Sequence, residues 1–92
     1  MITLLVRHQV ADFDSWMVAY TAQRGQLAAL GVIRDAALRA SADGNDVVVV
    51  HEFQTMEAAE AFVAMANQHD MQEMLKSAGV CGPVSFELFT NF

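Results

Sequence analysis

Hydrophobic residues follow two different spacings along this chain, and the change from one spacing to the other marks the expected elements. Residues 2–10 are mostly apolar or β-branched, which predicts a first strand. Residues 46–53 contain four consecutive valines, a pattern typical of a central strand that is buried on both faces. Residues 32–41 carry scattered charges and predict an edge strand, with a glycine-centred turn between these two strands. Residues 84–92 predict a last strand.

Helical spacing begins after Asp12 and Asp14, an acidic pair that supplies N-cap candidates for a first helix. Apolar residues then recur three and four positions apart. Gly31 stands where a left-handed residue is expected to end the helix. The stripe consists of Phe13, Trp16, Met17, Tyr20, Leu27 and Leu30.

Two more helices are predicted before the last strand. Thr55 is expected to cap the second helix. Asp70 and Glu73 resemble a capping box for a short third helix, which Gly79 would end. Their apolar stripes are Met56, Ala59, Phe62, Val63 and Ala66 for the second helix, and Met71, Met74, Leu75 and Ala78 for the third.

This order of elements predicts one α+β domain over residues 1–92, with the ferredoxin-like βαββαβ arrangement. Right-handed crossovers give an antiparallel four-stranded sheet in the order 4-1-3-2, with the helices on one face. Leu5, Val48 and Val50 should then point to the other face, which no helix covers. Because an apolar sheet face exposed to water is unfavourable, we expect a homodimer in which a second copy covers this face.

Alternation along the strands predicts which side chains lie under the helices. Arg7 and Glu52 are best placed on one face together, since opposite charges across strands attract. That choice puts His8, His51 and Phe53 on the face under the helices, provided that neither strand carries a bulge.

An aromatic pocket is therefore predicted between the sheet and the helices. His8 and His51 are its candidate catalytic residues, and its substrate-binding candidates are Trp16, Tyr20, Phe53, Phe62 and His69. The alternative is that the aromatic residues are plain core, and that each histidine is a hydrogen-bonded core or strand-end residue. For His69, which lies in the break between the two later helices, a loop or capping role is the alternative.

Composition narrows the classes of function. Of the 92 residues, 54% are hydrophobic and 17% charged, which is unusually apolar for a small domain and again favours a partner subunit. The net charge of −6 argues against nucleic acid and against anionic membranes. The single cysteine, Cys81, cannot form an internal disulfide, which suits the cytoplasm. The histidine spacing predicts no metal site, and no motif for a cofactor is present.

Three stretches, "VRHQVADFDSW", "VVVVHEFQTMEAAEAF" and "MLKSAGVCGPVSFE", together give the chain a likeness to a known group. The sequence resembles the dimeric α+β barrel superfamily, and within it the small antibiotic-biosynthesis-monooxygenase-like proteins. The resemblance covers nearly the whole chain. It implies a homodimeric α/β barrel with one pocket in each protomer.

In the cofactor-free monooxygenases of that group, the pocket holds an electron-rich aromatic substrate, which is deprotonated and reacts directly with oxygen. The resemblance implies that His8 or His51 would be the general base, and that Tyr20 or Trp16 would orient the ring. The haem-degrading branch is disfavoured, because it has a histidine iron ligand on the second helix, and the position that corresponds best in this sequence is Val63. The alternative functions are a non-catalytic protein of the same fold that binds a small molecule or is associated with stress, and a pure dimerisation scaffold.

Overall fold

The computed structural model describes residues 1–92 and contains four strands and three α-helices. Two short 3₁₀ turns follow the first helix. The strands are β1 (Ile2–Val10), β2 (Val32–Arg39), β3 (Asp46–Phe53) and β4 (Val80–Thr90), and the helical segments are α1 (Phe13–Gln23), η1 (Arg24–Gln26), η2 (Ala28–Leu30), α2 (Met56–Ala66) and α3 (His69–Ser77).

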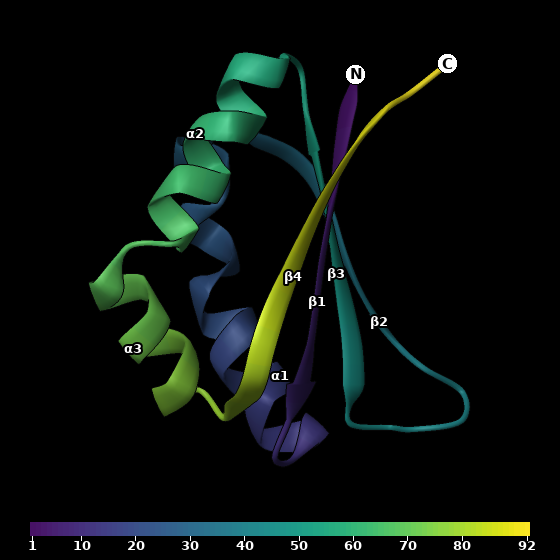
Figure 1. Ribbon diagram of the computed structural model, residues 1–92, viewed down its shortest axis with the longest axis vertical. Coiled ribbons are helices and arrows are strands. Elements are labelled where there is room, and N and C mark those ends of the chain that lie inside the picture. The colour runs from purple at the N-terminus through teal and green to yellow at the C-terminus, as the bar shows by residue number, and fades with distance from the viewer.

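The sheet is antiparallel, and its strands lie in the order β2-β3-β1-β4, which is the predicted order read from the other edge. All the helices lie on one side of the sheet, so its other side is bare in the single chain (Figure 1). The ferredoxin-like α+β fold and the position of the valine strand between two neighbours are thus confirmed.

The central pair of strands carries no bulge. β1 and β3 pair in unbroken register from Ile2 opposite Phe53 to Gln9 opposite Asp46. The face assignment made from alternation is therefore correct: His8 and His51 are buried under the helices, whereas Arg7 is exposed on the other face.

The pairing of charges on the open face differs from the prediction. Arg7 and Glu52 share that face but lie four residues apart in register, so each takes a nearer partner. The guanidinium of Arg7 binds the carboxylate of Asp46 at 2.5 Å, and Arg34 binds Glu52 at 2.9 Å.

Local capping explains where the first two helices begin. The side chain of Asp12 accepts hydrogen bonds from the backbone N–H and the hydroxyl of Ser15, so Asp12 rather than Asp14 is the N-cap. Thr55 caps α2 by accepting from the N–H of Ala58. The α1 helix ends at Gln23, earlier than its stripe suggested.

The predicted capping box of the third helix is wrong. The α3 helix begins at His69, so Asp70 and Glu73 both lie inside it. The N-cap position belongs to Gln68, whose side chain makes no capping hydrogen bond. The junction with α2 is instead tied by the Gln72 amide, which donates to the carbonyl of Ala66 at 2.8 Å.

β4 is longer than expected, because it begins at Val80 rather than at residue 84. Its pairing with β1 shifts opposite His8: Arg7 pairs with Ser85, but Gln9 pairs with Cys81. The extra residues of this bulge include Gly82, with φ 72°, and Pro83. Neither residue suits a regular ladder, and a bulge accommodates both.

The core lies between the sheet and the helices, where Leu4, Val47 and Phe53 are completely buried. On the open face, Val48 and Val50 are only half-buried in the single chain. The valine strand β3 is thus covered on one face only within the single chain, and its second face would be buried only by contact with another molecule. No helix combines the length and the apolar character needed to cross a membrane.

Candidate functional site

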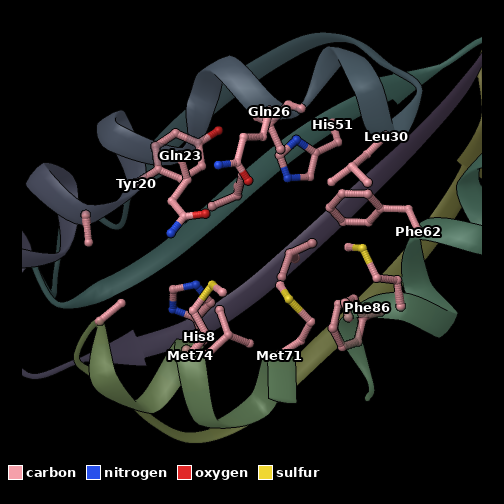
Figure 2. Close-up of a pocket in the computed structure, with 18 of the residues that line it drawn as sticks. His8, Tyr20, Gln23, Gln26, Leu30, His51, Phe62, Met71, Met74 and Phe86 are labelled. Carbon is pink, nitrogen blue, oxygen red and sulfur yellow. The ribbon is translucent and has the colours of Figure 1, made fainter. Parts of the chain in front are cut away.

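A cavity of about 300 Å³ lies between the sheet and the helices. Of its 19 lining residues, 15 are hydrophobic, and the four others are His8, His51, Gln23 and Gln26. α1 and the turns after it form one wall, α3 forms the opposite wall, and β1 and β3 form the floor (Figure 2). Its volume and its apolar lining with few polar groups are typical of a small-molecule site.

His8 is 5% exposed and lies on β1, opposite Val47. Its Nδ1 atom is buried and has no hydrogen-bond partner. Burial lowers the pKa of His8, and smaller opposing contributions from the neighbouring backbone and from the charge of Asp46 offset this only in part. The imidazole is therefore neutral at pH 7.

His51 is 4% exposed and lies on β3, opposite Leu4. Its Nδ1 is also buried without a partner, and the ring packs on Phe62 with centroids 5.1 Å apart. Burial lowers the pKa of His51 to about 4, against the opposing attraction of Asp35. A neutral imidazole with a free nitrogen accepts a hydrogen bond from a ligand hydroxyl.

The two histidines occupy different ends of the cavity (Figure 2). Leu4 is the cross-strand neighbour of His51, and His8 lies four residues further along β1, about 13 Å at 3.3 Å per residue. One small ion cannot bridge that span. No three His, Cys, Asp or Glu side chains lie together in an arrangement that could hold a metal ion.

Trp16 packs between His8 on the floor of the cavity and Tyr20 on its α1 wall. Its indole meets the His8 ring edge-on at 5.4 Å and stacks on Tyr20 at 5.1 Å with an interplanar angle of 16°. Trp16 is 4% exposed, so it is part of the core as well as of the lining. The helical spacing that predicted this stripe thus brings both rings to the cavity.

The hydroxyl of Tyr20 is already engaged. It donates to the Asp35 carboxylate at 2.6 Å, and the same carboxylate binds Arg24 at 2.9 Å. Burial and the bond to Asp35 raise the pKa of Tyr20. Tyr20 therefore offers a ligand the face of its ring, and its hydroxyl stays with Asp35.

Two of the predicted substrate-binding residues do not line the cavity. Phe53 is completely buried beneath Phe62, whose ring lies 5.4 Å away and shields it. His69 is exposed at the first residue of α3, because the apolar face of that helix begins two residues later at Met71. Phe62 does line the cavity, as do His8, His51, Trp16 and Tyr20.

Asp35 lies near the site, but the sequence pattern did not predict its position. Simple alternation from Val32 would place it on the open face of β2. An irregularity between Val32 and Arg34 shifts the register, so Asp35 faces the helices directly opposite His51. Other lining residues that were not expected include Gln23, Gln26, Met65 and Phe86. Nothing in the local sequence signals this position of Asp35, because it depends on the irregular pairing of β2 with β3.

No protein-family model matches this sequence, and neither does any curated protein. Solved structures do match its shape. A cofactor-independent oxygenase from Streptomyces nogalater, SnoaB, is 18% identical over 99% of this chain and 92% of its own, with a TM-score of 0.70. A monooxygenase from Streptomyces coelicolor, ActVA-Orf6, solved in complex with nanaomycin D, is 20% identical over 99% and 87%, with a TM-score of 0.68. The chain has the fold of the antibiotic-biosynthesis-monooxygenase-like proteins.

A third structure of this fold bears on assembly. A dimeric ferredoxin-like protein from an uncultured marine organism is 11% identical over 99% of this chain and 94% of its own, with a TM-score of 0.67. At these identities the likeness concerns the fold.

Proposed function

We propose that this protein binds a neutral, hydroxylated aromatic molecule in the cavity between sheet and helices. The observation that carries this proposal is the pair of buried histidines, His8 and His51, whose Nδ1 atoms lack a hydrogen-bond partner beside an apolar cavity. A buried polar atom without a partner is costly. A ligand hydroxyl at either end would satisfy it, and aromatic and thioether side chains would hold the ring.

We propose further that the bound molecule is oxidised by oxygen without a cofactor. One histidine, His8 or His51, takes a proton from the ligand hydroxyl or the carbon activated by it, and the resulting electron-rich anion reacts with O₂. For an anthrone, one oxygen atom becomes the new carbonyl, and the other leaves as water with the two methylene hydrogens. The monooxygenases of the same fold support this reaction class for the chain.

Oxygen uptake with a dihydroxyanthrone and a naphthohydroquinone tests this function. The wild type should consume oxygen faster than buffer, and His8→Gln or His51→Gln should lower kcat by about 10²-fold, the usual contribution of a general base. His69→Gln is the matched control, since His69 is exposed outside the cavity and should leave the rate unchanged. Unchanged rates in both cavity variants would remove the acid–base role.

A binding role without chemistry is the second candidate. It is favoured by the low pKa of His51, about 4, which makes this residue a better hydrogen-bond acceptor than base at pH 7. Under this alternative, the same two histidine variants weaken binding of a dihydroxyanthraquinone, while the wild type consumes no oxygen with either reduced compound.

The proposed assembly is a homodimer formed through the open face of the sheet. Leu5, Val48 and Val50 are half-buried there, and Leu38 is 55% exposed. Two ion pairs border this apolar patch, as in a polar rim around an apolar interface core. The dimeric protein of the same fold supports this arrangement. The exposed, unpaired Cys81 suits a reducing compartment such as the cytoplasm.

A further inference from the structure

The pairing of β2 with β3 places the side chain of Asp35, which is ionised, next to His51. The two residues are directly opposite on β2 and β3, so their side chains leave the sheet on the same face, under the helices. Side chains in such a pair have Cβ atoms about 5 Å apart. Asp35 is absent from the lining of the cavity, so it stands behind His51 relative to a bound ligand.

The Asp35 carboxylate is held in place from α1 and the turn after it. Tyr20 donates its hydroxyl to one carboxylate oxygen at 2.6 Å, and Arg24 binds the carboxylate at 2.9 Å and 3.3 Å. Burial would raise the pKa of Asp35, but the bonds from Tyr20 and Arg24 outweigh it and keep the pKa below its usual value. Asp35 is therefore a fixed negative charge at neutral pH.

No competing charge faces His51 from the other elements packed around it. Its cross-strand neighbour on β1 is Leu4, and the α2 side chain against its ring is Phe62. Of the other titratable groups of the cavity, His8 lies four residues further along β1 from Leu4, and Tyr20 is neutral and bonded to Asp35. Asp35 is thus the charge that acts on His51, and Arg24 is the cation paired with that carboxylate.

We propose that Asp35 is a positioning residue, whose carboxylate stabilises the imidazolium of His51 when that ring takes a proton from the bound hydroxyl. This inference rests on the proposed function of the site. In the step, the O–H bond of the ligand breaks and its electron pair stays on oxygen, while an N–H bond forms on His51. The cation then lies between the ligand anion and Asp35, and Arg24 limits how far Asp35 favours that cation.

The electrostatic role makes opposite predictions for two variants of the free protein. Asp35→Asn removes the anion and should lower the pKa of His51 by roughly one unit, the size expected from a charge a few ångströms away. Arg24→Gln removes the opposing cation and should raise that pKa. A merely structural role predicts something else: either variant would loosen α1, hydrate His51 and raise its pKa in both cases.

The measurement is an NMR titration of the imidazole Cε1–H signals, assigned with the His8→Gln and His51→Gln variants. Arg34→Gln is the matched control, since Arg34 adjoins Asp35 but binds Glu52 on the open face. It should leave the pKa of His51 unchanged. A fall in Asp35→Asn together with a rise in Arg24→Gln supports the proposal. Any other result in either variant overturns it.

This titration needs no ligand, so its outcome is independent of the oxygen-uptake experiment. If the wild type consumes no oxygen but the pKa of His51 shifts as expected in the two variants, the proposed oxidation is rejected and the effect of Asp35 on His51 stands. Oxygen uptake that depends on His51, with no shift in Asp35→Asn, would keep the function and reject the role of Asp35.

Discussion

The indole of Trp16 lies edge-on to the imidazole of His8, with ring centroids 5.4 Å apart and planes inclined by 67°. Trp16 is the only tryptophan of the chain, so its fluorescence reports on one end of the cavity. A protonated imidazole quenches a neighbouring indole by charge transfer. The relationship between these two rings therefore gives an optical signal for the charge of His8.

We expect Trp16 fluorescence to fall on acidification with a midpoint below pH 6.5, because burial lowers the pKa of His8. His8→Gln should abolish this transition at pH values where circular dichroism shows the protein still folded. His51→Gln should leave it in place, since His51 contacts Phe62 and not Trp16. A midpoint above 6.5 would contradict the burial of His8.

Stability should decrease as the pH falls from about 6.5 to about 4. In this range the unfolded chain protonates His51, whereas the folded chain keeps it neutral because its pKa is about 4. The unfolded state thus binds more protons, and the free energy of unfolding falls by about 3 kcal/mol over the range, at about 1.4 kcal/mol per pKa unit.

Urea unfolding at several pH values between 4 and 7 measures this dependence. His51→Gln should make it less steep, because glutamine does not titrate, and the remaining dependence includes the contribution of His8, whose pKa burial also lowers. His69→Gln should preserve it, since His69 is exposed in the folded chain. Equal slopes in the wild type and His51→Gln would show that His51 is not buried in its neutral form.

Val50→Asp should disrupt the proposed homodimer. Val50 lies directly between Leu5 and Ala36 on the open face, and the nearest cations, Arg7 and Arg34, are already paired with Asp46 and Glu52. Burying an unpaired charge costs several kcal/mol. Light scattering after size exclusion should show a monomer or an unfolded chain. Val18→Asp is the control, because Val18 is 73% exposed on α1 and should leave the dimer intact.

Ala19→Leu should reduce ligand binding by filling the cavity from α1. Ala19 lines the cavity, whereas Ala22 on the same helix is exposed and provides the matched control, Ala22→Leu. We expect about tenfold weaker binding of a dihydroxyanthraquinone in Ala19→Leu, equivalent to about 1.4 kcal/mol. Calorimetry measures it, and equal affinity in the two variants would place the ligand outside this cavity.

Much of the fold follows from local pattern. The bounds of β1 and β3 were predicted correctly, because strongly apolar runs with clear turn signals allow few alternatives. Less regular segments were predicted less well. Gly82 and Pro83 looked like a turn before the last strand, but a bulge allows them to lie within β4. The α3 helix begins at His69, one residue before the predicted cap Asp70, and the Gln72 side chain bonds its first turn to α2.

From the sequence, alternation together with the placement of Arg7 and Glu52 on one face determined that His8 and His51 share the helix-covered face, and the unbroken pairing of β1 with β3 confirms it. The sequence also determined that Trp16, Tyr20 and Phe62 lie above them, through helical spacing. These relationships depend on a few consecutive residues and on the regular periods of strand and helix.

Only the tertiary structure decided which of these side chains surround a cavity and which fill the core. Phe53 and Phe62 have the same chemistry, yet Phe53 is covered and Phe62 lines the space, because their depth depends on how the helices pack. The position of Asp35 opposite His51 depends on a register shift in β2, which no local pattern marks. Contacts between distant segments set both outcomes, so they are fixed only when the whole chain folds.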